Sequence, residues 1–297
     1  MKKIKIQITC NWCNDDSIFE RFSKCYHMPQ DSIFDLVKDH TYDYLVIFNA
    51  DTNHTYKTNV SHKNKIGVVG EPMWAGEKYI NYLQQHCQHI LYHSQVNDQI
   101  VYYPGLLPNH FDLDNADATY CFDKLLTESP TKTKKCSMIV SNTPDTLRPA
   151  PNTIYHKRRQ FAEMILRTDM DVDIYGKGWM VGSDSRIKGE IMDKRNGLQD
   201  YEFSIAIENS VEGGYFTEKL TDCIMLNTTP IYYGCPNIEM FFDNIVNLKS
   251  LDTVDELFKI LSAPAKQQQQ NKIKLKEKFN LFVALNKYLK HITKHEQ

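Results

Sequence analysis

The segment FSIAIENSVEGGYFTEKLTDCIMLNTTPIYYG, residues 203–234, decides the fold of this chain. Its first part, residues 203–208, is an apolar run typical of a buried strand. A loop with two adjacent glycines follows and leads to residues 217–226, which have the composition of a helix. Residues 229–232 read as a second buried strand. A strand, a helix and another strand in this order predict a parallel sheet in an α/β domain.

The glycine loop and the first turn of the predicted helix form a pattern typical of an anion site. Backbone N–H groups are free at a helix N-terminus, and the helix dipole favours negative charge there. Lys219 in the first turn opposes that dipole, so we expect a bound anion such as phosphate to neutralise it. Glu218 has a carboxylate that can chelate two ribose hydroxyls. The segment contains neither GxxxxGK[ST] nor GxGxxG, so it is neither a Walker P-loop nor a dinucleotide fingerprint.

The same alternation of strands and helices runs through most of the chain. Short runs rich in β-branched residues predict further strands at residues 4–9, 44–48, 66–69, 90–93, 137–141 and 172–175. Amphipathic patterns between them predict helices at residues 18–25, 79–88 and 157–167. Strands buried on both faces and separated by helices indicate two Rossmann-like domains. Two such domains are expected to face each other across a ligand-binding cleft.

The length of 297 residues is sufficient for two domains, each with its own core. A polar, lysine-bearing stretch at residues 127–136 is the predicted linker. We therefore expect an N-terminal domain at residues 1–130, a C-terminal domain at residues 131–265 and a helical tail at residues 266–297.

The tail carries eight lysines against two glutamates, and its apolar residues recur at helical spacing. This pattern predicts a closing helix that packs on the body of the protein. A basic surface helix with peripheral membrane contact is the alternative.

Charge and hydropathy restrict the classes of partner. The net charge of −2 argues against bulk attraction to nucleic acid. The first apolar run is interrupted by Lys5 and Gln7, which is typical of a strand and not of a signal peptide. No apolar stretch approaches the roughly 18 residues that a membrane helix needs. We expect a soluble, cytoplasmic protein.

The chain also resembles a known family in the region of the deciding segment. The run IAIENS, then GYFTEKLTDCIMLNTTPIYYG, is similar to the signature of the α-1,3/4-fucosyltransferases, glycosyltransferase family 10. That signature combines Phe-Glu-Asn, Tyr-x-Thr-Glu-Lys and Pro-Ile/Val-x-x-Gly. Ile207 stands here where an aromatic residue is usual. The similarity covers roughly residues 137–242, and the N-terminal domain matches only loosely.

The resemblance implies a GT-B fold and an inverting, metal-independent transfer of fucose from GDP-fucose to a hydroxyl of an oligosaccharide or glycoconjugate. An α-1,3 linkage to GlcNAc or glucose would fit. The matching donor-site positions are Arg158, Asn209, Tyr215, Glu218 and Lys219. Arg158 and Lys219 would face the diphosphate, and Glu218 the ribose. The adjacent Arg159 is a rival to Arg158, because one sequence cannot separate them.

A general base for the acceptor hydroxyl is expected in the first domain. Glu71 follows a predicted strand at its carboxyl end, where α/β domains present functional residues. Pro72 favours an extended backbone at Glu71 and so fixes its direction. The family carries a glutamate in a comparable context as its base. An ordinary surface-loop glutamate is the alternative.

Two other groups of residues suggest different chemistry. Asp169, Asp171 and Asp173 contain a DxD pattern, which binds metal in some transferases, although here it precedes a strand instead of following one. Cys10 and Cys13 form a CxxC pair after the first strand and have no second pair at a spacing that suggests zinc. A redox dithiol and ordinary buried cysteines remain open for this pair. At the level of function, a GT-B transferase for another nucleotide sugar and an inactive nucleotide-sugar-binding protein are the alternatives.

Overall fold

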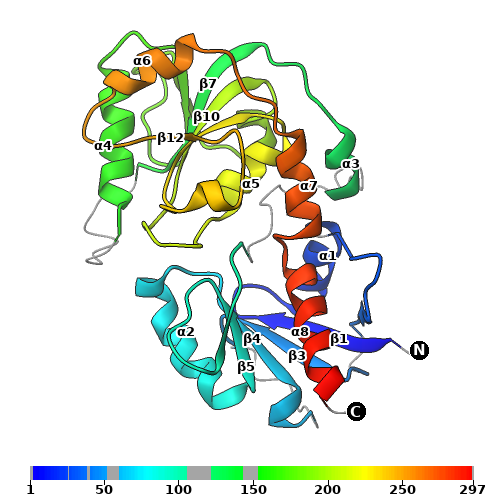
Figure 1. The fold of residues 1–297 in the computed structure, drawn as a ribbon. Helices are drawn as coiled ribbons and strands as arrows, with labels where there is room; N and C mark the ends of the chain where they lie inside the picture. Colours follow the sequence, from blue (N-terminus) through cyan, green and yellow to red (C-terminus); the bar gives the residue numbers. More distant parts are fainter. Residues whose placement is uncertain are drawn as a thin grey trace. The chain divides into compact units, whose positions relative to one another are not determined.

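The structure is a computed structural model that describes residues 3–25, 27–38, 41–51, 60–105, 122–142 and 153–295. The chain divides into two compact units. Unit 1 comprises Met1–Pro108 with Leu275–Gln297, and unit 2 comprises Asn109–Lys274. Each unit contains a six-stranded parallel sheet with helices packed on it (Figure 1).

Unit 1 follows an open α/β topology in which the strand order is β2-β1-β3-β4-β5-β6. Its order of elements resembles that of flavodoxin-like sheets, and the direction of winding changes between β1 and β3. The elements are β1 (Ile4–Cys10), α1 (Asp15–Cys25), β2 (Phe34–Leu36), β3 (Tyr44–Phe48), β4 (Lys65–Val68), α2 (Met73–His86), β5 (His89–Tyr92), β6 (Ile100–Tyr102) and α8 (Leu281–His295). A short 3-10 turn, η1 (His62–Asn64), precedes β4.

Helices cover both faces of the unit 1 sheet because its central strands are apolar on both sides. All five residues of β3 are buried. Helix α2 packs its Ile80 and Leu83 on one face. Helix α8 lies on the other face, where Tyr288 contacts His89 of β5 and Phe282 contacts Phe34 of β2.

Unit 2 has the strand order β12-β11-β10-β7-β8-β9, which is the Rossmann order with its change of direction between β7 and β10. Its strands are β7 (Lys134–Ile139), β8 (Val172–Tyr175), β9 (Ile187–Gly189), β10 (Tyr201–Ile207), β11 (Thr229–Tyr233) and β12 (Val246–Asn247). Its helices are α3 (Phe122–Thr127), α4 (Tyr155–Leu166), α5 (Glu218–Met225), α6 (Asp255–Ser262) and the 3-10 turns η3 (Lys194–Gly197) and η4 (Ile238–Met240). Helix α7 (Gln269–Glu277) crosses the division between the units.

The alternating side chains of β10 show how the unit 2 core is built. Phe203, Ile205 and Ile207 join a buried cluster with residues of α4 and α6. The intervening Ser204 is on the side of α5, close enough to Cys223 to influence the pKa of that thiol. Helices therefore cover both faces of the sheet, as the near-continuous apolar strands predict.

The predicted architecture of two Rossmann-like halves and a C-terminal helix is confirmed, and two details differ. The linker prediction at residues 127–136 was wrong at its end, because Lys134 already begins β7. The two units also do not end at residues 130 and 265. The reason is that α8 buries its apolar face on the unit 1 sheet, so the end of the tail joins the first unit.

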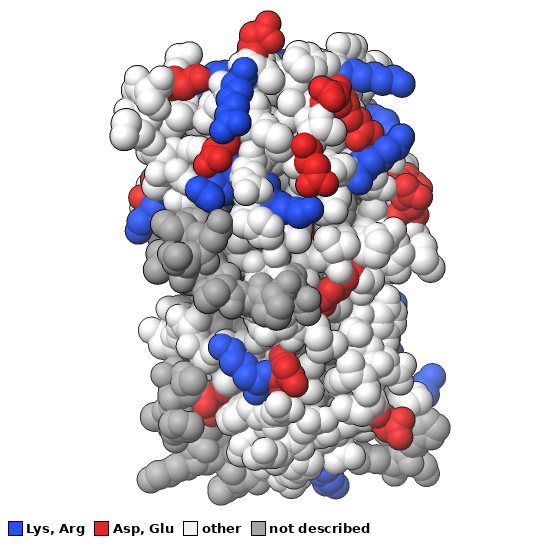
Figure 2. Space-filling model, turned by 90° about the vertical axis from the view of Figure 1, so that its left-hand side faces the viewer, with Lys and Arg blue, Asp and Glu red and all other residues white. Residues whose placement is uncertain are grey.

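The described residues contain no helix that is both long and apolar enough to cross a membrane. On the face seen in Figure 2, lysine and arginine side chains are interspersed with aspartate and glutamate side chains. Among the described residues of that face, no large area carries one sign of charge.

Candidate functional site

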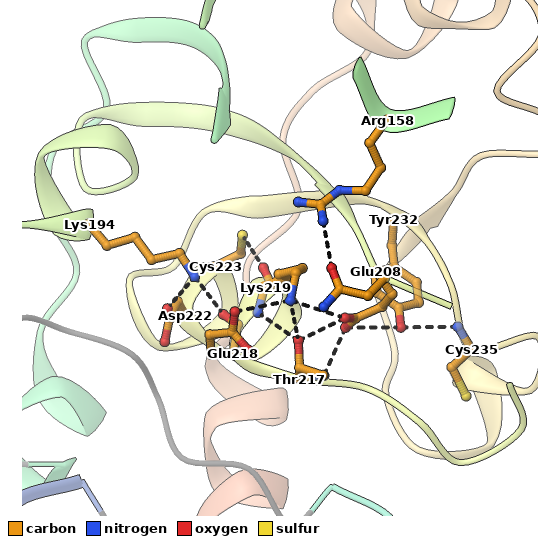
Figure 3. A network of polar contacts seen from close by, with 11 residues as sticks. Arg158, Lys194, Glu208, Thr217, Glu218, Lys219, Asp222, Cys223, Tyr232 and Cys235 are labelled. Carbon is orange, nitrogen blue, oxygen red and sulfur yellow. Dashed lines mark hydrogen bonds and ion pairs between the residues drawn. The ribbon is translucent and has the colours of Figure 1, made fainter. Parts of the chain in front are cut away.

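The candidate donor site lies in unit 2 at the carboxyl end of β10. This position is next to β7, at the point where the direction of the sheet's winding changes, and ligands of open α/β sheets bind at such points. The chain continues from β10 through Glu208 and Asn209 into a loop that ends at Thr217, the N-cap of α5. Figure 3 shows the polar network that these residues form with Arg158 and Lys194.

Glu208 follows β10, and its side chain lies at the N-terminal end of α5. Its side chain is fully buried, and its two oxygens accept hydrogen bonds from the Thr217 backbone N–H (2.8 Å) and hydroxyl (2.7 Å). The helix dipole and these donors stabilise the carboxylate. Burial nevertheless raises the pKa of Glu208, and the attraction of Lys219 only partly offsets that effect. The carboxylate of Glu208 therefore lies where the sequence pattern predicts a bound anion.

Lys219 is neutralised within the protein. Its Nζ lies 3.1 Å from Glu218, 3.6 Å from Glu208 and 3.2 Å from the Thr217 hydroxyl oxygen. No bound anion is therefore needed to balance the positive charge of Lys219. The sequence shows that Lys219 lies unfavourably in the first turn of a helix. It does not show that the buried carboxylate of Glu208 faces this lysine.

The expectation of free N–H groups in the glycine loop was also incomplete. The N–H of Gly214 donates to Asn237 Oδ1 (3.0 Å) and Cys235 Sγ (3.2 Å). The Lys219 N–H donates to the Thr217 hydroxyl. Side chains of unit 2 therefore already satisfy several donors that the pattern assigned to phosphate.

Arg158 is a buried cation with one donor that the described residues do not use. It projects from α4, is 8% exposed, and donates through Nη1 to Asn209 Oδ1 at 2.6 Å. Its buried Nε has no hydrogen-bond partner among the residues that the structure describes. Burial lowers the pKa of Arg158, while the nearby Glu208 and Glu218 act in the opposite direction. A buried guanidinium with an unused N–H is suited to a phosphate oxygen.

The neighbouring Arg159 points to a different environment. Its guanidinium pairs with Glu163 one turn along the same helix, at 3.4 Å. The two arginines differ because successive residues of a helix lie about 100° apart around its axis. The geometry therefore brings Arg158, and not Arg159, to the end of β10.

The remaining predicted donor-site residues lie in the same region. Tyr215 is buried in the loop before α5 and is close enough to Arg158 to influence its pKa. Glu218 is the first residue of α5, partly exposed. Arg158, Asn209, Tyr215, Glu218 and Lys219 thus form one cluster although up to 61 positions separate them in the sequence.

One strong ion pair of this region was missed by the sequence analysis. Lys194 of η3 donates to the fully buried Asp222 of α5 at 2.6 Å and to the Glu218 backbone carbonyl at 3.2 Å. Burial alone would lower the pKa of Lys194. The nearby carboxylates of Asp222 and Glu218 outweigh this effect, so the pKa of Lys194 is raised. This pair fixes the start of α5 from outside the helix. The sequence carries no local signal of this pair, because Lys194 and Asp222 are 28 positions apart.

Gly234, which follows β11, makes room for the Glu208 side chain. A Cβ atom at this position would lie 2.4 Å from Glu208 Cγ and 2.8 Å from the Tyr232 hydroxyl oxygen. Both neighbours are fully buried, so neither can move aside cheaply.

We expect Gly234→Ala to lower the free energy of unfolding by about 3 kcal/mol, because it overpacks this site. Gly213→Ala is the matched control, since its Cβ would meet nothing closer than Asn237 Oδ1 at 3.6 Å. Urea unfolding of both variants measures the difference. Equal midpoints would show that Glu208 can move away from Gly234.

Glu71 lies in unit 1 at the carboxyl end of the sheet, as predicted. It stands between β4 and the Pro72 N-cap of α2 and is partly exposed. Asn49, at the end of β3, accepts a hydrogen bond from the Gly70 N–H at 3.0 Å and has a positive φ of 62°. Asn49 therefore fixes the backbone that presents Glu71, and no motif in the sequence marks this role.

The aspartate cluster has a structural use. Asp173 lies in β8, accepts a hydrogen bond from the Tyr201 hydroxyl at 2.7 Å and pairs with Lys188 at 3.1 Å. Asp169 and Asp171 are exposed. Within the described ranges, no three His, Cys, Asp or Glu side chains come together in a way that could hold a metal ion.

Comparison with known proteins gives a family match in this half of the chain. The profile of "Glycosyltransferase family 10 (fucosyltransferase) C-term" matches residues 129–273. A putative fucosyltransferase-like protein of Arabidopsis thaliana is 30% identical over 135 residues, which are 43% of this chain and 25% of that protein. An α-(1,3)-fucosyltransferase of Helicobacter pylori is 34% identical over 68 residues, 22% of this chain and 14% of that protein.

Among solved structures, an α1,3-fucosyltransferase with GDP-fucose is similar at 18% identity and a TM-score of 0.46, over 88% of this chain and 77% of that one. The curated relatives are thus matched over a quarter of their length or less. The family profile nevertheless spans Arg158, Asn209 and the whole of α5. Over residues 129–273 this chain is similar to the C-terminal, fucosyltransferase-type domain of glycosyltransferase family 10.

Proposed function

We propose that this protein transfers fucose from GDP-fucose to a hydroxyl group of an acceptor glycan, with inversion at the anomeric carbon. The observation that carries the proposal is the family match over residues 129–273, which contains the buried Arg158–Asn209 pair. That pair lies where Rossmann-type sheets bind their ligands.

Arg158 has the first role in this proposal. When the bond from fucose to GDP breaks, the diphosphate gains negative charge. A fixed cation aimed at that charge stabilises the transition state by several kcal/mol. The bond from Arg158 to Asn209 fixes the guanidinium in advance, and its unused Nε–H provides a donor for a phosphate oxygen. We propose that this cationic stabilisation replaces a divalent metal.

Glu218 and Lys219 have the second role. The partly exposed carboxylate of Glu218 is proposed to accept hydrogen bonds from the ribose hydroxyls. The charge of Lys219 is shared with Glu208 and Glu218, so its contribution to binding the diphosphate is smaller than that of Arg158. Tyr215 and Asn209 complete the proposed donor site.

Glu71 is the proposed general base. The acceptor hydroxyl must lose a proton as it attacks the anomeric carbon, and a positioned carboxylate can accept it. A single direct displacement inverts the configuration. An α-1,3 linkage to GlcNAc or glucose is proposed from the family resemblance, with unit 1 as the acceptor-binding part.

A panel of nucleotide sugars tests this function. With acceptor glycans on an array, labelled GDP-fucose should give product, and GDP-mannose or UDP-sugars should give little. Transfer from another donor alone would make this a transferase for that sugar. Binding of GDP without any transfer or hydrolysis would indicate an inactive binding protein. Activity that is lost in chelator and returns with manganese would contradict the metal-independent mechanism.

Arg158→Gln is expected to lower kcat/KM for GDP-fucose by about 10²–10³-fold, as removal of one fixed donor to a developing charge does. Arg159→Gln is the matched control, because its partner Glu163 lies on the same helix. The control should retain activity within a few fold. Donor kinetics of the two variants measure this, and an equal loss in both would contradict the assignment of Arg158.

A further inference from the structure

Two cysteine side chains lie against each other at the end of β1. Cys10 is the last residue of β1 and is fully buried, and Cys13 is partly exposed in the following loop. Their Sγ atoms are 3.4 Å apart. That separation is about 1.4 Å more than the ~2.0 Å of a disulfide bond, so a small movement of the loop would be enough to form one.

The position of this pair in the sheet gives it a functional setting. The loop after β1 lies where the winding of the unit 1 sheet changes direction, between β1 and β3. Cys10 is in register with Phe48 of β3, and Phe48 is in register with Val68 of β4. Glu71 follows three residues after Val68. The thiol pair and the proposed base therefore share the carboxyl edge of one sheet, about two strand spacings or ~10 Å apart in register.

The residues between the two cysteines contact β3, the strand that pairs with β4, and α2, the helix that follows Glu71. The ring of Trp12 packs edge-on against Phe48, with centroids 5.0 Å apart. The side chain of Asn11 donates to the hydroxyl of Tyr79 in α2, at 3.4 Å. Helix α2 begins directly after Glu71 and Pro72. A change in this loop therefore acts on both neighbours of the proposed base.

We propose that Cys10 and Cys13 are a redox-active dithiol that closes to a disulfide by exchange with a small-molecule disulfide, and that closure changes acceptor use at the Glu71 edge. The first part rests on the position of the two sulfur atoms. The second part rests in addition on the proposed function.

The exchange occurs in two balanced steps. Cys13, the more accessible thiol, loses its proton and attacks one sulfur of the small disulfide, which forms a mixed disulfide and releases one thiolate. Cys10 then loses its proton and attacks Cys13 Sγ, which forms the internal disulfide and releases the second thiolate. The two protons go to the two released thiolates. Burial raises the pKa of Cys10 to about 12, in keeping with a role as the second, resolving thiol.

Peptide mapping of the full chain tests the exchange. Trypsin releases residues 6–21, a peptide whose only cysteines are Cys10 and Cys13. After incubation with oxidised glutathione, the wild-type peptide should have lost two hydrogen atoms, and dithiothreitol should restore them. Cys10→Ser should stop at the glutathione adduct on Cys13. Cys13→Ser should form no adduct in this peptide, because Cys10 is buried.

Either of two results would overturn the dithiol: a wild-type peptide that keeps both thiols, or one that stops at the mixed disulfide as Cys10→Ser does. The Cys10→Ser adduct also shows whether Cys13 is reachable in the folded protein. These readouts need no enzymatic activity, so they stand even if GDP-fucose is not the donor.

Kinetics test the effect on acceptor use. Oxidation of the wild type is expected to lower kcat/KM for the acceptor by about 10–10²-fold, because a misplacement of positioning groups by about 1 Å can cost up to about 10²-fold. The KM for GDP-fucose and the affinity for GDP should stay the same, and Cys13→Ser should not respond to oxidant. A closed disulfide with unchanged acceptor kinetics would refute the coupling to the Glu71 edge.

Discussion

Replacing Glu71 by glutamine is expected to lower kcat for fucosyl transfer by about 10²–10⁴-fold, the usual contribution of a positioned general base. Glutamine keeps the shape of the side chain but cannot accept the proton of the acceptor hydroxyl. The affinity for GDP should remain unchanged, because the proposed donor residues lie in unit 2 and Glu71 in unit 1. Transfer kinetics and GDP titration calorimetry measure the two effects separately.

Glu77→Gln provides the matched control. Glu77 lies in α2, a few residues after Glu71, and is exposed. This variant should transfer fucose at the wild-type rate. If Glu71→Gln did the same, another group would have to act as the base, and Glu71 would be an ordinary surface glutamate.

Replacing Lys219 by methionine is expected to lower the free energy of unfolding by about 3–5 kcal/mol, because it leaves a buried carboxylate without its counter-charge. Glu208 is fully buried, and Lys219 is its cationic partner at 3.6 Å. Loss of donor use in this variant would therefore combine two effects, a weaker fold at the start of α5 and a missing cation. Urea unfolding followed by circular dichroism measures the first effect alone.

The loss of stability in Lys219→Met should depend on pH. Burial raises the pKa of Glu208 in the folded protein, and the attraction of Lys219 opposes that shift. Without Lys219 the folded pKa rises further above the unfolded value, so folding then favours proton uptake. Stability of the variant relative to wild type is therefore lowest above the folded pKa of Glu208 and recovers as the pH falls through it.

The double variant Glu208→Gln/Lys219→Met separates charge from packing. It removes both partners, so most of the lost stability should return at neutral pH. A loss in Lys219→Met that is independent of pH and persists in the double variant would mean that packing of the lysine stem, and not the charge, stabilises the site.

The central elements of the fold follow from local sequence patterns. The strand, loop and helix around residues 203–234 appear in the structure as β10, the Thr217 cap and α5, within one or two residues of the prediction. Apolar runs of four or more residues were sufficient to identify such strands, as for β4, β5 and β8. The shortest strands, β2, β6, β9 and β12, have only two or three residues and were missed. A segment of two or three residues is too short to show the alternation of apolar and polar residues that identifies a strand.

The candidate site was predictable in composition but not in its electrostatics. The sequence placed Glu71 at a strand end, and the family resemblance gathered Arg158, Asn209, Tyr215, Glu218 and Lys219. It could not show that Glu208 lies at the start of α5 or that Lys194 pairs with Asp222. Those contacts join residues that are 9 and 28 positions apart. The first of them also depends on the packing of Glu208 against Gly234.

The sequence by itself determined the order of strands and helices, the strand ends that carry Glu71 and Glu208, and the residue types available for binding a nucleotide sugar. Each of these depends on neighbours within a few positions. Only the tertiary structure decided which arginine faces the end of β10, which anion caps α5, and where the C-terminal helix packs. These outcomes depend on which buried charges and apolar faces meet, and residues far apart in the chain determine that jointly.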